Sequence, residues 1–248
     1  MKAVTIAFAI SLVLITSCTK DKQQQQPVIF SATGDVSIKL NEFRNQLGVL
    51  NTTTGQTNGR REINWDGVPD NFVGVKLPED FFNATTAGSP VSQQRGLLYA
   101  GNSDAMVSKT KFAEVNAQAS SEFVSFSGNK SFAVVNALLW PVEFRVAGET
   151  TVAVVKGFGI IFSDVDKSNS TFIEFFNNNK SLGKYYVPAH DNNTSFSFLG
   201  IYFKDQTITR VNVGHEGKLI DGEKDITQGG SKDLVMLDDF IYSEPQKQ

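Results

Sequence analysis

The sequence predicts an all-β protein, an antiparallel β-sandwich with one short helix near the start of the folded part. Short segments rich in β-branched and aromatic residues, bounded by Gly, Asn, Asp or Ser, recur along most of the chain. The composition has 20 phenylalanines against 5 tyrosines and 2 tryptophans, which favours strands and a well-filled sandwich core. Only one segment has helical periodicity, so we expect consecutive strands to pair antiparallel.

Residues 1–17 are predicted to be a lipoprotein signal peptide. Lys2 supplies a positive charge, residues 3–15 form an apolar run, and Ser17 is a small residue directly before Cys18. An apolar run of about 13 residues is too short for the roughly 20 that a helix needs to cross a bilayer. We therefore expect this segment to be cleaved rather than to span a membrane.

Cys18 is the only cysteine of the chain, and the sequence that precedes it resembles the lipobox of bacterial lipoproteins. The resemblance implies diacylation of the Cys18 sulfur and acylation of its new amine by a chain such as palmitate. The alternative is an ordinary buried thiol. Two or three acyl chains, at about 0.8 kcal/mol for each buried CH₂, would anchor the protein stably to a membrane.

The mature chain is predicted to consist of a tether, one domain and a short tail. Residues 18–27 contain "TKDKQQQQP", a polar segment that cannot bury enough apolar surface to fold. No internal repeat or long linker divides residues 28–243, which we interpret as a single domain followed by a tail at 244–248. The formal net charge is −3 and the basic residues are scattered, so nucleic acid is not an expected partner.

The first element of the domain is predicted to be an amphipathic helix. Val36, Leu40, Phe43 and Leu47 recur at the spacing of one helical face, and Gly48 is a natural C-terminal stop.

All later elements are predicted to be strands. We expect them at residues 61–65, 96–100, 122–127, 131–135, 141–146, 153–162, 172–176, 184–187, 195–203, 208–213 and 234–242.

Four segments resemble a family of uncharacterised secreted bacterial proteins. They are "GRREINWDGVPDNF", "PEDFFN" with "RGLLY", "VKGFGIIFSDVDKSNSTFIEFF", and "SFLGIYF" with "ITRVNV" and "VMLDDFIYSEP". Members typically share a "GRREINWDGVP" start, a "GFG" and "DVD" centre and a "MDDF" and "EP" end, and the similarity covers residues 36–245. The resemblance implies a secreted protein of a Gram-negative bacterium. It does not indicate any particular activity.

The ending also resembles the last strand of jelly-roll carbohydrate-binding and galactose-binding-like modules, which implies a jelly-roll-like sandwich. Asp238 and Asp239 lie inside an apolar run, and adjacent strand residues point to opposite faces, so one of the two carboxylates should face inward. In the modules that it resembles, such an aspartate binds a structural Ca²⁺. The alternative is an ion pair with Arg60 or Arg61.

A second set of oxygen ligands follows a predicted strand in "SDVDKSN". Asp164, Asp166, Ser168 and Asn169 alternate as in calcium loops, although the glycine and distal glutamate of an EF-hand are missing. The alternative is a polar turn whose side chains bond backbone amides.

Catalytic motifs are scarce. His190 and His215 both lie in turn-like sequences outside any metal or nucleophile motif, and we expect them to be solvated loop residues. A glycosidase would need two facing carboxylates. The candidates for such a pair are Glu62, Asp66, Asp70, Glu79 and Asp80.

Binding through exposed aromatic rings is the stronger functional hypothesis. Trp65, Tyr99, Tyr185 and Tyr186 are candidates to stack on sugar faces, with Asp66 as a hydrogen-bonding neighbour. The alternative is that these rings belong to the core.

The sequence therefore predicts a non-catalytic binding module for carbohydrate, anchored through Cys18 in the cell envelope. Thr19 in place of an aspartate after Cys18 resembles sorting to the outer membrane. The alternatives are a polysaccharide-acting hydrolase that uses surface carboxylates and a purely structural or adhesive surface protein.

Overall fold

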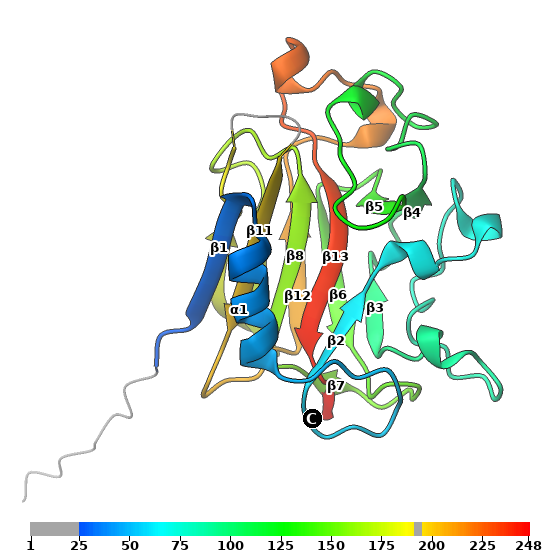
Figure 1. Cartoon of the computed structure of the whole chain (residues 1–248), viewed down its shortest axis with the longest axis vertical. Helices are drawn as coiled ribbons and strands as arrows, with labels where there is room; N and C mark the ends of the chain where they lie inside the picture. Colours follow the sequence, from blue (N-terminus) through cyan, green and yellow to red (C-terminus); the bar gives the residue numbers. More distant parts are fainter. Residues whose placement is uncertain (1–24, 191–194) are drawn as a thin grey trace, which may run out of the picture.

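The protein is a sandwich of antiparallel sheets, as predicted, with one helix on its outside. The computed structural model describes residues 25–190 and 195–248. Figure 1 looks onto the first sheet, with helix α1 in front of it and the second sheet behind it. Cys18 and the predicted signal peptide lie outside the described residues.

The first sheet has seven strands in the order β1-β11-β8-β13-β5-β4, with β2 paired to β13. Its strands are β1 (Val28–Gly34), β2 (Arg60–Ile63), β4 (Ala105–Ser108), β5 (Ser131–Val134), β8 (Gly157–Ser163), β11 (Phe196–Tyr202) and β13 (Met236–Ser243).

The second sheet has five strands in the order β10-β9-β12-β6-β3, and a small two-stranded sheet joins β14 to β7. The strands are β3 (Leu97–Tyr99), β6 (Leu139–Phe144), β7 (Ala153–Val154), β9 (Phe172–Asn177), β10 (Lys180–Tyr186), β12 (Arg210–Gly214) and β14 (Gln246–Lys247).

Short 3₁₀ helices connect these strands. They are η1 (Trp65–Gly67), η2 (Asp70–Phe72), η3 (Val91–Gln93), η4 (Ala119–Ser121), η5 (Leu219–Asp221) and η6 (Ile226–Gln228).

Helix α1 (Ser37–Leu47) forms where its periodicity predicts it and covers the outer face of the first sheet. Phe43 packs on Phe30 and Phe198 with ring centroids 5.3 and 5.7 Å apart. Gly200 allows this close approach, because a Cβ there would lie 3.1 Å from the Phe43 ring and 2.9 Å from Phe198. The apolar contact of helix and sheet supplies the driving force for this packing.

Three strand predictions were wrong. Residues 122–127 form no strand, because Val124 and Phe126 donate their amides to the side chains of Ser163 and Asp238 rather than to a neighbouring strand. The predicted strand at 153–162 is divided into β7 and β8, and β1, β4 and β14 were not predicted at all. At the end of β2, Asn64 caps η1 by accepting from the Asp66 amide, so Trp65 starts a turn.

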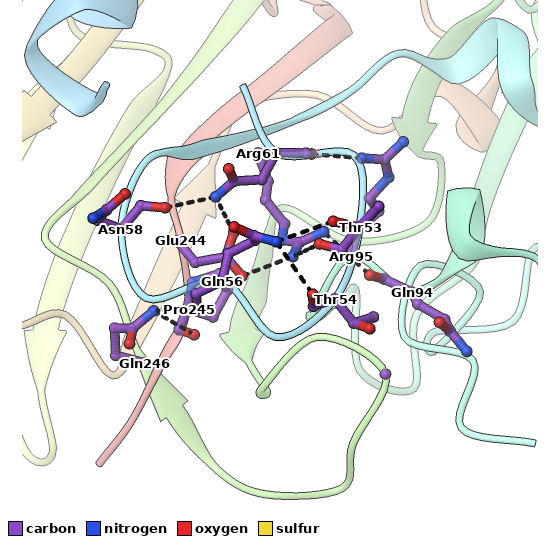
Figure 2. Close-up of polar contacts among 12 residues, drawn as sticks. Thr53, Thr54, Gln56, Asn58, Arg61, Gln94, Arg95, Glu244, Pro245 and Gln246 are labelled. Atoms are coloured by element: carbon purple, nitrogen blue, oxygen red, sulfur yellow. Dashed lines mark hydrogen bonds and ion pairs between the residues drawn. The ribbon is translucent and has the colours of Figure 1, made fainter. Parts of the chain in front are cut away.

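A buried ion pair joins the start of the domain to its end. The Arg61 guanidinium is fully buried and lies 2.7 Å from a Glu244 oxygen. Arg61 also donates to the backbone oxygens of Thr53 and Gln94 at 2.8 and 3.3 Å, and Asn51 donates to the other Glu244 oxygen at 2.8 Å. Figure 2 shows how the loop before β2 closes around Arg61.

The ion pair corrects two predictions. Arg60 and Arg61 do not contact the acidic pair of β13, because β2 meets β13 only from Phe240 onward and the acidic pair lies beyond the end of β2. Arg60 instead bonds Glu62 at 2.6 Å. Residues 244–248 are not a free tail, since they supply Glu244 and strand β14.

Glu244→Gln should destabilise the domain strongly, because it leaves the buried Arg61 charge without compensation. Removing one partner of a buried pair typically costs about 3–5 kcal/mol. Arg44→Gln is the matched control: it breaks a half-buried pair with Glu62, which Arg60 also neutralises, and we expect a cost of about 1 kcal/mol or less. Urea unfolding of both variants measures the difference, and equal losses would contradict the assignment of Arg61 and Glu244 as the main tie.

Candidate functional site

Two of the predicted ligand-binding rings lie in the core between the sheets. Trp65 and Tyr99 are 0% and 1% exposed. The Trp65 ring stacks on Phe132 at 4.0 Å and donates its indole N–H to the Asp238 carbonyl at 2.9 Å. The prediction that they present ring faces to a ligand was therefore wrong, because the strand that we expected at 61–65 turns inward at its end.

Tyr185 and Tyr186 separate to opposite faces of β10. Tyr185 is half-buried and packs edge-on against Phe175 at 5.7 Å, whereas Tyr186 is 49% exposed. Only Tyr186 of the predicted aromatic set is exposed. Asp66 lies elsewhere, where its carboxylate accepts from the Asn129 amide at 2.8 Å.

The outer face of the second sheet carries rings that the sequence analysis did not name as candidate ligand-binding residues. Along β9, Ile173 and Phe175 are buried, while Phe172, Glu174 and Phe176 alternate with them and are partly exposed. The signal was present in "FIEFF", because a glutamate that shares its face with two phenylalanines indicates a solvent-facing side.

Charged side chains flank these rings at short distances. The Lys184 ammonium lies 4.1 Å from the Phe172 ring centroid, and the Arg210 guanidinium lies 4.5 Å from that of Phe176. Phe172 lies flat across Gly214, where a Cβ would come within 2.2 Å of the ring.

The registers of the second sheet place polar groups in a row between the rings. Lys184, Glu174 and Asn212 lie opposite one another across β10, β9 and β12, and the apolar Pro141 continues the row on β6. Ser181 donates to Glu174 at 2.9 Å. These side chains are all half-buried or exposed, so no other part of the described chain covers them fully.

A hollow of about 350 Å³ continues this face at β6 and β3. Its side chains include the apolar Leu98 and Pro141 and the charged Glu79, Glu143 and Arg145. Arg145 and Glu143 form an ion pair at 3.3 Å.

Two of the other predicted carboxylates, Glu62 and Asp70, are paired with basic side chains. Burial raises the pKa of Glu62, but its bonds to Arg44 and Arg60 outweigh that effect and leave the pKa below its usual value. Bonds to Lys109 and Lys130 lower the pKa of Asp70. Basic neighbours keep these carboxylates ionised. This favours a structural role for them over proton transfer in catalysis.

The two histidines lie in separate places. His215 is buried, in contrast to the prediction, and burial lowers its pKa to about 4. Its Nδ1 lies 2.7 Å from the Gly217 carbonyl, so the neutral ring donates there. His190 is half-buried, and its backbone amide donates to the Val165 carbonyl.

A β-bulge brings Asp238 and Asp239 to the same partner. β13 has one extra residue between Leu237 and Phe240 relative to β8, which breaks the strict alternation of faces. Both carboxylates accept from the Ser127 hydroxyl, at 3.1 and 2.7 Å. They are thus held by hydrogen-bond donors of the 122–127 segment.

The bulge also raises the proton affinity of the buried pair. Burial and then the charge of Asp239 raise the pKa of Asp238 to about 8, and burial raises the pKa of Asp239 as well. Two adjacent buried carboxylates cannot both ionise without a counterion.

A third acidic group lies at the end of the sandwich where β8 finishes, at the top of Figure 1. Asp164 and Asp166, from the predicted "SDVD" turn, meet Asp225 there, and one oxygen of each lies within 4.8 Å of the others. Asp225 comes just before η6 and was not predicted, since it is 61 residues along the chain from Asp164 and belongs to no motif.

The acidic group raises the proton affinity of its members. Burial, followed by the charges of Asp166 and Asp225, raises the pKa of Asp164 to about 9. Burial and contact with Asp225 raise the pKa of Asp166 to about 7, and burial raises that of Asp233 to about 6.

Comparison with protein-family models, with curated proteins and with solved structures finds no match.

The wild type should lose stability as the pH rises from about 5 to about 8, and Asp238→Asn should lose less over the same range. The native pKa of Asp238 is about 8 against the usual 3.8, so the native state keeps a proton that the unfolded chain releases. The stabilisation is complete below the unfolded pKa and is lost as the pH rises through the native one. Each pKa unit corresponds to about 1.4 kcal/mol.

Thermal melts in EDTA at both pH values measure the effect, with Asp221→Asn at an exposed site of η5 as the control. Acids away from the pair, which the wild type and the variant share, cancel in the comparison. An unchanged pH dependence in Asp238→Asn would show that the pair does not hold the proton.

Proposed function

We propose that the protein is a lipid-anchored envelope protein that binds glycans through the outer face of the second sheet. The observation that carries this proposal is the row of partly exposed rings, Phe172, Phe176 and Tyr186, with hydrogen-bonding side chains between them on an uncovered sheet. The face is defined here by these rings together with Glu174 and Asn212.

Saccharides suit this face because they combine flat apolar C–H surfaces with rings of hydroxyls. Aromatic rings cover the apolar surface, and a small number of fixed polar groups determine the orientation. Glu174 can accept from hydroxyls, whereas Asn212 can both donate and accept. Lys184 and Arg210 add positive charge beside the rings, which favours glycans that carry carboxylates or phosphates.

The same face is poorly suited to an extended apolar partner. Its outward positions alternate rings with charged residues, so no continuous hydrophobic patch forms across the strands. The hollow at β6 and β3 gives room for a further sugar unit next to Glu143 and Arg145.

The tether at 18–27 would place this module near a membrane while leaving the binding face free. No helix among the residues that the structure describes is long and apolar enough to cross a membrane. The anchor in the proposal is the acylated Cys18.

Single substitutions on the face should weaken glycan binding without unfolding the domain. We expect Phe172→Ala and Tyr186→Ala to cost about 1 kcal/mol or more, a fivefold or greater loss of affinity, and Asn212→Ala to cost about 1 kcal/mol for a lost hydrogen bond. A glycan array selects the ligand, and calorimetry on that glycan measures the affinities.

Lys39→Ala on the exposed side of α1 is the control on the opposite sheet. No glycan bound at all, or full binding by all three face variants, would contradict the proposal. Release of new reducing ends during the assay would instead favour a hydrolase.

Cys18→Ala should move the protein from the membrane to the soluble fraction, because the acyl chains supply the anchoring free energy. Cell fractionation followed by immunoblotting measures this, with Ser17→Ala as the neighbouring control that keeps a small residue before the cysteine. A membrane fraction that stays unchanged in Cys18→Ala would defeat the lipid-anchor prediction.

A further inference from the structure

We propose that Asp164, Asp166 and Asp225 bind one Ca²⁺ ion at the end of the sandwich. One carboxylate oxygen from each of them lies within 4.8 Å of the others. Ligands of the same Ca²⁺ lie about 2.3–2.6 Å from the ion, so two of them are separated by at most about 5 Å. The three oxygens therefore fit one coordination sphere without rearrangement of the backbone.

Asp164 independently indicates a missing ligand. Its side chain is 2% exposed, and neither carboxylate oxygen has a hydrogen-bond partner among the described residues. Buried carboxylates are costly unless they are paired or coordinate a metal. The residue also has a φ of +67°, a left-handed conformation that few side chains adopt, and this turns the chain sharply at the end of β8.

The second and third ligands are held in place before any ion binds. Asp225 Oδ2 accepts from the Thr227 amide and hydroxyl at 2.7 and 2.8 Å, and Oδ1 accepts from the Leu234 amide at 2.8 Å, which fixes the carboxylate while leaving a lone pair on Oδ1. Asp233 accepts from the backbone amides of Asp166 and Lys167, at 3.1 and 2.9 Å, and so shapes the loop that carries Asp166. One Asp166 oxygen is buried and has no partner in the described chain.

Basic side chains close to the group are used elsewhere. Lys167 pairs with Glu216 at 2.7 Å, and Lys232 pairs with Glu223 at 2.9 Å. None of the ion pairs found in residues 25–190 and 195–248 includes Asp164, Asp166 or Asp225. The ion pairs of these lysines therefore bring no positive charge to the three aspartates, and a divalent cation is the charge that would balance them.

The ligand chemistry selects Ca²⁺ among divalent ions. All three side chains offer carboxylate oxygen, the donor that hard cations prefer, and the group contains no thiolate or imidazole to favour zinc. Mg²⁺ requires near-ideal octahedral geometry at about 2.0–2.1 Å and keeps several waters, whereas Ca²⁺ accepts irregular sites of six to eight oxygens. Backbone carbonyls and water would complete the sphere.

An ion here would connect two segments that are far apart in the chain. Asp164 and Asp166 belong to the loop after β8, and Asp225 belongs to the turn that opens η6. The proposal does not depend on the glycan function, because these residues lie outside the face that carries Phe172 and Tyr186.

The test is a titration of the purified full mature chain after removal of metals with EDTA. Calorimetry should give one Ca²⁺ per chain, and saturating Ca²⁺ should raise the melting temperature by about 5 °C or more. Mg²⁺ at the same concentration should have a smaller effect. No Ca²⁺-dependent shift, or an equal shift with Mg²⁺, would overturn the assignment.

Two variants locate the site. Asp164→Asn should weaken Ca²⁺ binding at least tenfold, yet in EDTA it should melt at or above the temperature of the wild type, because it removes an uncompensated buried acid. Asp238→Asn is the matched control at an equally buried aspartate and should bind Ca²⁺ as the wild type does. Normal binding by Asp164→Asn together with loss of binding in Asp238→Asn would overturn the proposal.

Discussion

The pairing of Arg61 with Glu244 is the constraint on which the surrounding structure depends. A fully buried guanidinium must be neutralised and its N–H groups must find acceptors, since burying a charge without compensation is very costly. Glu244 supplies the opposite charge, and the backbone oxygens of Thr53 and Gln94 supply acceptors. The loop before β2, the strand β13 and the segment before β3 therefore have to meet at one point, as Figure 2 shows.

The buried acids of the molecule differ in how the chain compensates them. Glu244 has an arginine, and Asp238 with Asp239 has a serine hydroxyl that bonds both carboxylates. Asp164 has neither a cation nor a donor among the described residues. A buried acid with a structural role has a cation or a hydrogen-bond donor beside it within the chain. Asp164 lacks both among the described residues, and this distinguishes it as a candidate ligand of a metal ion.

The fold could be predicted from the sequence because its signals are local. The helical period of Leu40, Phe43 and Leu47 and the alternation in most strands are each readable within about ten residues, and both describe a face that must be buried. The 122–127 segment misled this reasoning, because side-chain acceptors on β8 and β13 take its amides. The sequence of the segment itself does not show that side chains of distant strands will accept these hydrogen bonds.

The candidate sites were predictable only in part, for the same reason. Asp164 and Asp166 stand two residues apart in a turn and could be recognised as ligands, but Asp225 joins them only through tertiary contact. Asp238 and Asp239 were assigned to opposite faces, as the regular pleat requires, and a single inserted residue brought them together. Trp65 looked exposed because it stood among charged residues, and the turn at η1 directs it inward.

The position of β13 has a consequence for the order of folding. This strand lies in the middle of the first sheet, bonded to β8, β2 and β5, yet it follows every other strand of that sheet along the chain. The sheet cannot close on a partial chain, and pairings of such long sequence separation form slowly. A growing chain of this topology therefore stays open until β13 is available.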